Sequence, residues 1–299
     1  MVLHDAHCHF FSSRFFETLG RERQPDRAPA ADEVAGQLGW DAPGGPEALT
    51  DRWIAEMDRN HVTRAALMAS VPGDEESVAT AVTRYPQRLV GYFALNPMAP
   101  HAADRATRAF AQQGLSCVCL FPAMNHYELM DDHVVRIFEI AAEHGGAVFV
   151  HCGYLSIEAR VKLGLPSLFD LRLGDPLAVA TVAVRFPSVP VIIPHFGAGF
   201  FREALMAADV CPNIHLDTSS SNSWLKYVPG LTLPEVFHCA LTIVGPSRLL
   251  FGTDSSFFPR GWRRVIYGAQ MTALDELGVE PEACGRIFSG NFDRIFPSQ

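Results

Sequence analysis

Short runs of apolar residues alternate along this chain with longer segments whose apolar positions recur at helical spacing. Eight of the short runs are rich in Val, Ile, Leu and Phe, as buried strands are. They span residues 2–9, 64–70, 89–96, 115–121, 147–151, 190–196, 213–217 and 248–254. Strands that alternate with helical segments predict βαβ units and a parallel sheet.

The longer segments are predicted to be helices. They span residues 50–60, 75–85, 101–113, 132–144, 175–186, 199–208, 233–244 and 282–296. Some end at a proline, as in Tyr85-Pro86, because proline disfavours helical geometry in the residue before it. Eight strands with eight helices predict an α/β protein with the (β/α)8 TIM-barrel fold, in a single domain over residues 1–299.

One long stretch interrupts this alternation near the N-terminus. Residues 10–48 contain several prolines, a Gly44-Gly45 pair and many charges, and they separate the first strand from the first helix. Inserted loops of this length are commonly lids or binding loops. We therefore expect a loop or lid insertion here, with room for a short helix.

Composition and charge exclude some classes of partner. Hydrophobic residues make up 48% of the chain and charged residues 19%, as in a globular protein with a large core. The net charge of −9 leaves no basic surplus, so we expect no nucleic-acid and no membrane partner. The N-terminal residues do not resemble a signal peptide and no run is long enough to span a membrane, which predicts a cytoplasmic protein with reduced cysteines.

Metal-binding residue types stand at the ends of four predicted strands. The first strand ends in His7 and His9, the fifth in His151, the sixth in His195 and the eighth in Asp254. In a TIM barrel the carboxyl ends of all strands open onto one face, where active sites lie. We expect these five side chains to meet there.

The spacing of His7 and His9 brings two ligands together. Strand side chains alternate, so both imidazoles point to one side and Cys8 to the other. With His151 and Asp254 they supply three ring nitrogens and one carboxylate, which suit one divalent metal ion, zinc or alternatively manganese, with a water in the open position. His195 would approach the same space without being a ligand.

The chain resembles the amidohydrolase superfamily, in the branch of amidohydrolase-related proteins and aminocarboxymuconate semialdehyde decarboxylase. The resemblance covers nearly the whole chain. Its motifs are residues 5–9 (DAHCH), 55–59 (AEMDR), 84–88 (RYPQR), 150–153 (VHCG), 193–197 (IPHFG), 251–254 (FGTD) and 290–292 (GNF). Phe196-Gly197 departs from the glycine run that the decarboxylase has after this histidine.

This resemblance implies a distorted barrel whose metal is held at the positions of His7, His9, His151 and Asp254. It also implies a catalytic or substrate-polarising role for His195. Binuclear members of the superfamily bridge two metals with a modified lysine on the fourth strand. Residues 115–121 contain no lysine, and the whole chain has only two, which predicts a mononuclear site.

The predicted function is that of a metal-dependent hydrolase. Metal-activated water would attack an ester, lactone or amide, Asp254 would take the proton of the water, and His195 would hydrogen-bond the substrate carbonyl or the developing oxyanion. Arg14, Arg202 and Arg260 follow ligand-bearing strands and are expected to bind a small anionic substrate.

Two other functions fit the same residues. The first is a metal-dependent, non-oxidative decarboxylase of an unsaturated or aromatic acid. The second is a non-catalytic or metal-free barrel, because fold alone does not imply function. From the resemblance we also expect a homodimer that pairs through outer helices.

Overall fold

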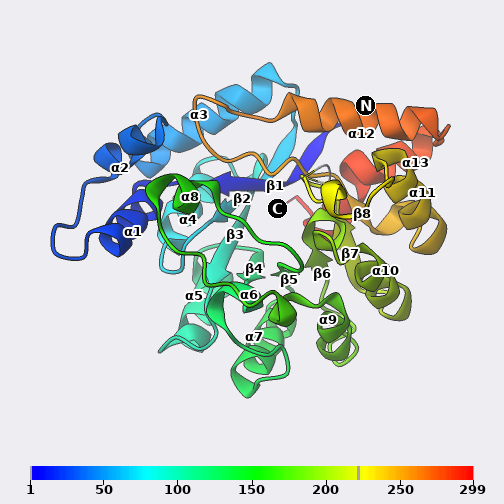
Figure 1. Cartoon of the computed structure of the whole chain (residues 1–299), viewed down its shortest axis with the longest axis horizontal. Helices are drawn as coiled ribbons and strands as arrows, with labels where there is room; N and C mark the ends of the chain where they lie inside the picture. Colours follow the sequence, from blue (N-terminus) through cyan, green and yellow to red (C-terminus); the bar gives the residue numbers. More distant parts are fainter. Residues whose placement is uncertain (1, 221–222, 299) are drawn as a thin grey trace.

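The computed structural model describes residues 2–220 and 223–298. Its centre is a sheet of eight parallel strands in sequence order, β1 to β8, which confirms the predicted TIM barrel (Figure 1). The strands are β1 (His4–Phe10), β2 (Arg64–Ala69), β3 (Leu89–Leu95), β4 (Cys117–Leu120), β5 (Ala147–Val150), β6 (Val191–Ile193), β7 (Ile214–Asp217) and β8 (Leu249–Leu250). Each strand falls within, or within one residue of, a predicted apolar run.

The barrel closes between β1 and the chain that follows β8. The strand β8 has only two residues, so most of this seam lies beyond it. Across the seam, the N–H of Ala6 donates to Phe251 O at 2.8 Å, the N–H of Asp254 to His7 O at 2.9 Å, and the N–H of His9 to Ser255 O at 2.7 Å. The barrel is therefore closed but irregular, and residues at the site take part in its closure.

Helices surround the strands (Figure 1). Those that match predicted helices are α3 (Pro46–Arg59), α4 (Glu75–Arg84), α5 (Ala102–Gln112), α7 (Asp132–Glu143), α9 (Pro176–Ala183), α10 (Phe201–Val210) and α11 (Leu233–Ile243). Apolar side chains between helices and strands form the outer core, with Trp53, Phe93, Phe138 and Phe237 among its largest members.

The prediction for the end of the chain needs a correction. The helix that follows β8 is α12 (Arg264–Glu276), which we did not predict from the sequence. Gly268 lowers its helix propensity. The predicted helix over residues 282–296 corresponds to a continuous helical stretch made of α13 (Pro281–Gly285), a π-helical turn (Arg286–Gly290) and α14 (Asn291–Ile295). Phe292 and Phe296 pack there with the side chains that fill the barrel interior.

Residues 10–48 contain two helices, α1 (Ser13–Arg23) and α2 (Ala31–Leu38). Together with the short α8 (Glu158–Leu163) after β5, they form a small separate hydrophobic cluster. Among its buried members are Phe15, Val34, Trp40 and Leu163. The segment is therefore more ordered than the predicted loop, because its own apolar residues bury one another.

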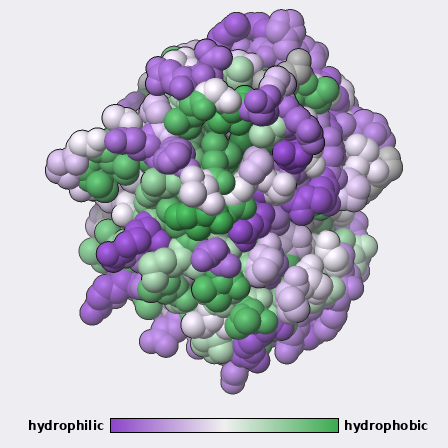
Figure 2. Space-filling model, turned by 90° about the vertical axis from the view of Figure 1, so that its right-hand side faces the viewer, coloured by the Kyte–Doolittle hydropathy of each residue, from purple (hydrophilic) through white to green (hydrophobic). Residues whose placement is uncertain are grey.

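The outer surface is mixed in character. Figure 2 shows one side of the molecule, where hydrophilic residues predominate and hydrophobic residues gather toward the middle. Among the described residues, no helix has both the length and the apolar character needed to cross a membrane. The seven cysteines are free thiols, and five of them are buried.

Asp5 ties the two sides of the seam together. Its fully buried carboxylate accepts hydrogen bonds from the N–H of His7 at 2.9 Å and, across the seam, from Thr253 and Trp262. Thr253 contributes its N–H at 3.1 Å and its hydroxyl at 2.5 Å, and Trp262 its indole N–H at 2.7 Å. Burial raises the pKa of Asp5, although these donors act to lower it.

We expect Asp5→Ala to lower the free energy of unfolding by at least about 2 kcal/mol, because buried donors on Thr253 and Trp262 would lose their acceptor. Trp262→Phe removes one of these hydrogen bonds, and the loss of that bond should lower the free energy of unfolding by about 1 kcal/mol. Urea denaturation measures both. Asp26→Ala, at an exposed residue, is the control. Equal stability of Asp5→Ala and the control would show that the seam does not depend on Asp5.

Candidate metal centre

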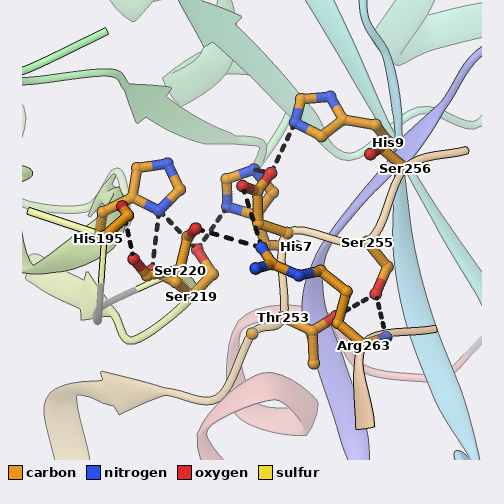
Figure 3. Close-up of polar contacts among 12 residues, drawn as sticks. His7, His9, His195, Ser219, Ser220, Thr253, Ser255, Ser256 and Arg263 are labelled. Atoms are coloured by element: carbon orange, nitrogen blue, oxygen red, sulfur yellow. Dashed lines mark hydrogen bonds and ion pairs between the residues drawn. The ribbon is translucent and has the colours of Figure 1, made fainter. Parts of the chain in front are cut away.

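Four histidines and one aspartate gather at the carboxyl ends of the strands, as the sequence predicts. His7 and His9 lie on β1. His151 directly follows β5, His195 lies two residues after the end of β6, and Asp254 lies four residues after the end of β8. All five line one pocket of about 430 Å³. His7 stands between His9 and His195, with ring centroids 5.2 and 5.0 Å away (Figure 3).

Three of these residues are close enough to share a metal ion. The candidate ligand atoms of His7, His9 and Asp254 all lie within 4.8 Å of one another. Oδ1 of Asp254 is 3.1 Å from Nε2 of His9 and 3.8 Å from Nε2 of His7. His151 lines the same pocket outside this group, and its buried Nδ1 has no hydrogen-bond partner among the described residues.

The far nitrogens of His7 and His9 are each held by a hydrogen-bond acceptor. Nδ1 of His7 is 2.6 Å from Oδ2 of Asp217, at the end of β7. A carboxylate only accepts, so Nδ1 carries the proton. Nδ1 of His9 is 2.7 Å from the Ser70 hydroxyl, which itself donates to Met68 O at 3.0 Å. In the neutral form of either ring, Nε2, which lies near Asp254, is therefore the nitrogen left to bind a cation.

The charge states suit a metal as well. Burial, followed by the charges of His195 and His7, lowers the pKa of His151 well below its usual value. Burial also lowers the pKa of His9. Burial acts to raise the pKa of Asp254, but its interactions with His9, His7 and His195 outweigh this and lower it. Burial acts to lower the pKa of His7, but the charges of Asp217 and Asp254 and the hydrogen bond to Asp217 outweigh this and raise it. The site thus offers neutral His9 and His151 and an ionised Asp254, the forms that bind metal, whereas His7 favours a proton that a metal would displace.

His195 is held in an unusual backbone conformation. Its φ is +57°, and Phe196 and Ala198 nearby also have positive φ. Its Nδ1 lies 2.8 Å from Ser219 O, which can only accept, so this nitrogen carries the proton. Burial, then the charge of His7, lowers the pKa of His195. Its neutral ring therefore offers Nε2 as an acceptor, and it can donate from Nε2 only after it has taken up a proton.

Only one of the three predicted arginines lines the pocket. Arg260 does, whereas Arg14 and Arg202 do not. Arg14 is exposed and lies against Gly73. The side chain of Arg202 is 83% exposed on α10 and pairs with Glu203 at 2.5 Å. The prediction placed both in loops at the mouth because they follow ligand-bearing strands, but they lie on helices α1 and α10 and are not among the residues that line the pocket.

Several residues of the site escaped the sequence analysis. Arg263 and Lys226 line the pocket, and Ser70 and Ser219 contact the histidines. Ser219 Oγ lies 2.9 Å from Nδ1 of His7 and 3.0 Å from Nδ1 of His195 (Figure 3). Asp217 ends its strand just as the predicted ligands do, so the same signal could have identified it.

Comparison with known proteins places the chain in a family. A family model described as "Amidohydrolase" matches residues 4–297, nearly the whole chain. The protein belongs to this amidohydrolase family, which confirms the family and the class of enzyme predicted from the sequence.

Solved structures with the same fold have low sequence identity to the chain. An amidohydrolase from Burkholderia multivorans with bound zinc has a TM-score of 0.68 and 14% identity, with 100% of both chains covered. A probable 2-pyrone-4,6-dicarboxylic acid hydrolase from Acinetobacter baumannii with citric acid bound has a TM-score of 0.62 and 15% identity, with 99% of both chains covered.

A third is the 5-carboxyvanillate decarboxylase from Novosphingobium aromaticivorans, complexed with manganese and 4-hydroxy-3-methoxy-5-nitrobenzoic acid. It has a TM-score of 0.66 and 14% identity, with 99% of this chain and 96% of that chain covered. The neighbours thus include a hydrolase and a decarboxylase, and both reactions predicted from the sequence fit the family.

Proposed function

We propose that this protein is a mononuclear metal-dependent hydrolase that acts on an ester, lactone or amide of a small carboxylate-bearing substrate. The observation that carries the proposal is the convergence of His7, His9 and Asp254 within 4.8 Å, with the far nitrogens of both rings held by acceptors. His151 is proposed as the fourth ligand, because its buried Nδ1 lacks a partner among the described residues.

One zinc ion is the proposed cofactor, with manganese as the alternative. Three nitrogens and one oxygen form a donor set that zinc commonly takes. Similar structures hold zinc in one case and manganese in another. The end of β4 supports a single ion. Phe121 follows this strand, and the centroid of its ring lies 5.7 Å from that of the His151 ring, with 24° between the two ring planes. Phe121 has no ligand atom, so β4 offers nothing at this point to bridge a second metal.

Asp254 and His195 are proposed to move the protons. A divalent metal in this site would polarise oxygen ligands and lower the pKa of a bound water. Asp254 is ionised and can accept a proton from a water in the pocket. His195 offers Nε2 as a second acceptor, and once protonated it can donate to the leaving group. Attack of water on the carbonyl carbon then gives hydrolysis.

Decarboxylation of an aromatic or unsaturated acid is the second candidate. The aromatic side chains of the pocket wall, among them Phe11, Trp40 and Phe257, support it, because they suit a planar substrate. Incorporation of ¹⁸O from water into the product indicates hydrolysis, and release of carbon dioxide indicates decarboxylation. The cytoplasmic location, the homodimer and the lid role of residues 10–48 stay predictions.

We expect His151→Ala and Asp254→Ala each to remove the metal and the activity while the barrel stays folded. Elemental analysis of the purified proteins measures the metal, and circular dichroism tests the fold. His133→Ala, at an exposed histidine on α7, is the matched control and should keep one equivalent of metal per chain. Stoichiometric metal in both variants would overturn the ligand assignment.

His195→Asn should keep the metal and lower kcat by at least about 100-fold, the usual effect of losing a general acid–base group. Asparagine tolerates the positive φ at this position, so the backbone should be preserved. Metal content and kcat are measured on the same preparation. If metal and turnover are lost together, His195 is a ligand instead.

Asp217→Ala should weaken metal binding about 10- to 100-fold, because Asp217 would no longer fix the proton on Nδ1 of His7 or the orientation of its ring. Competition with a chelator measures the affinity. Asp209→Ala, at an exposed residue on α10, serves as the control. An affinity equal to that of the wild type would show that Asp217 does not support the site.

A further inference from the structure

Ser219 lies between the rings of two histidines of the site, His7 and His195. Its Oγ is 2.9 Å from Nδ1 of His7 and 3.0 Å from Nδ1 of His195 (Figure 3). Its carbonyl oxygen lies 2.8 Å from the same nitrogen of His195. Because both Nδ1 atoms carry protons, the two oxygens of Ser219 act as acceptors. One fully buried residue thus contacts both a candidate metal ligand and the proposed acid–base group.

Asp217 fixes the position of Ser219. The N–H of Ser219 donates to Oδ1 of Asp217 at 2.6 Å, and Oδ2 of the same carboxylate accepts from Nδ1 of His7 at 2.6 Å. Asp217 is fully buried, so these hydrogen bonds form in a region of low dielectric constant, where they are stronger than in water. Asp217 therefore holds His7 directly and His195 through Ser219.

Thr218, between Asp217 and Ser219, anchors the backbone of this segment. Its N–H donates to Leu250 O on β8 at 2.9 Å. Its hydroxyl donates to Oε1 of Gln270 on α12 at 2.6 Å, and Nε2 of Gln270 donates to Thr218 O at 2.8 Å. Thr218 and Gln270 are both fully buried. The backbone that carries Ser219 is therefore fixed by β8 and α12 before any ligand binds.

Gly252, two residues before Asp254, leaves the space in which these groups meet. A Cβ atom at Gly252 would lie 2.7 Å from Oδ1 of Asp217 and 3.0 Å from the Cβ atoms of His7 and Ser219. The φ of Gly252 lies outside the left-handed region, so its backbone conformation does not itself require glycine. The requirement is the close approach of the three neighbouring residues.

We propose that Ser219 is a positioning residue for His195: fixed by Asp217, it sets the orientation of the His195 ring relative to His7 and leaves Nε2 as the nitrogen of His195 that can exchange protons in the pocket. Gly252 is a second positioning residue, because it allows Asp217, His7 and Ser219 to pack together. The use of His195 in proton transfer rests on the proposed function, whereas the orientation of its ring does not.

Exchange of the ring protons with water tests this inference. Protein labelled with ¹⁵N-histidine is studied by NMR with and without zinc, and His195→Asn identifies the signal of the Nδ1–H of His195. Ser219→Ala should speed exchange at His195 about three- to tenfold, the effect of losing one neutral hydrogen bond. Exchange at His7 should change less, because Asp217 still accepts from its Nδ1.

Asp217→Ala should speed exchange at both rings, since it removes the acceptor of His7 and the group that fixes Ser219. The internal reference is His4 at the amino end of β1, whose buried Nε2 lies 3.1 Å from Asp293. Exchange at His4 should stay as in the wild type. Equal acceleration at His4 and His195 would show general loosening of the barrel and would overturn the inference.

Gly252→Ala should speed exchange at both rings by more than Ser219→Ala does, because the new Cβ displaces Asp217 and Ser219 together. Gly268→Ala is the matched control. Gly268 is exposed on α12, and a Cβ there would meet no atom within 4 Å, so both rings should behave as in the wild type. If Gly252→Ala does not fold, Ser219→Ala and Asp217→Ala still decide the question.

The same samples separate this inference from the proposed function. Wild-type exchange at His195 in both Ser219→Ala and Asp217→Ala, in protein that binds one zinc ion, would overturn the inference and leave the hydrolase proposal standing. Failure of the wild type to bind zinc, with exchange at His195 still dependent on Ser219, would overturn the hydrolase proposal and leave the positioning role of Ser219 intact.

Discussion

The seam between β1 and the chain after β8 is the constraint on which the rest of the site depends. His7 and His9 lie on one side of it and Asp254 on the other, and backbone hydrogen bonds from Asp254 and His9 are part of the closure. The buried carboxylate of Asp5 holds both sides at once. Closing the barrel and assembling the candidate ligands are thus one structural event.

The chemistry of the pocket follows from the direction in which each ring is turned. Asp217, Ser70 and Ser219 O hold Nδ1 of His7, His9 and His195, so that Nε2 is the nitrogen each ring can offer to a metal or a proton. Ring nitrogens of His7 and His9 lie close to the ionised carboxylate of Asp254, and such a donor set favours a cation between them. Nδ1 of His195 is held in the same way by Ser219 O, so Nε2 of His195, beside His7, His9 and Asp254, can accept a proton.

The pocket is completed by parts of the chain that lie far apart in sequence. The segment of residues 10–48 contributes Phe11, Phe15 and Trp40, and the loop after β8 contributes Phe257, Arg260 and Arg263. These groups meet because Trp40 stacks on Phe257 and because Glu56 and Asp5 hold Trp262. Local sequence around any one of them gives no sign of the contact.

The barrel, the strand ends and the five polar residues at its mouth could be predicted from the sequence, because strand alternation and the polarity of parallel βα units are local or topological rules. The tertiary structure decided which arginines line the pocket, since Arg260 and Arg263 do so and Arg14 and Arg202 do not. It also decided the proton positions on the histidines, through partners such as Asp217, 210 residues away from His7. Side-chain direction on a loop and hydrogen bonds between distant strands depend on packing, which no local pattern encodes.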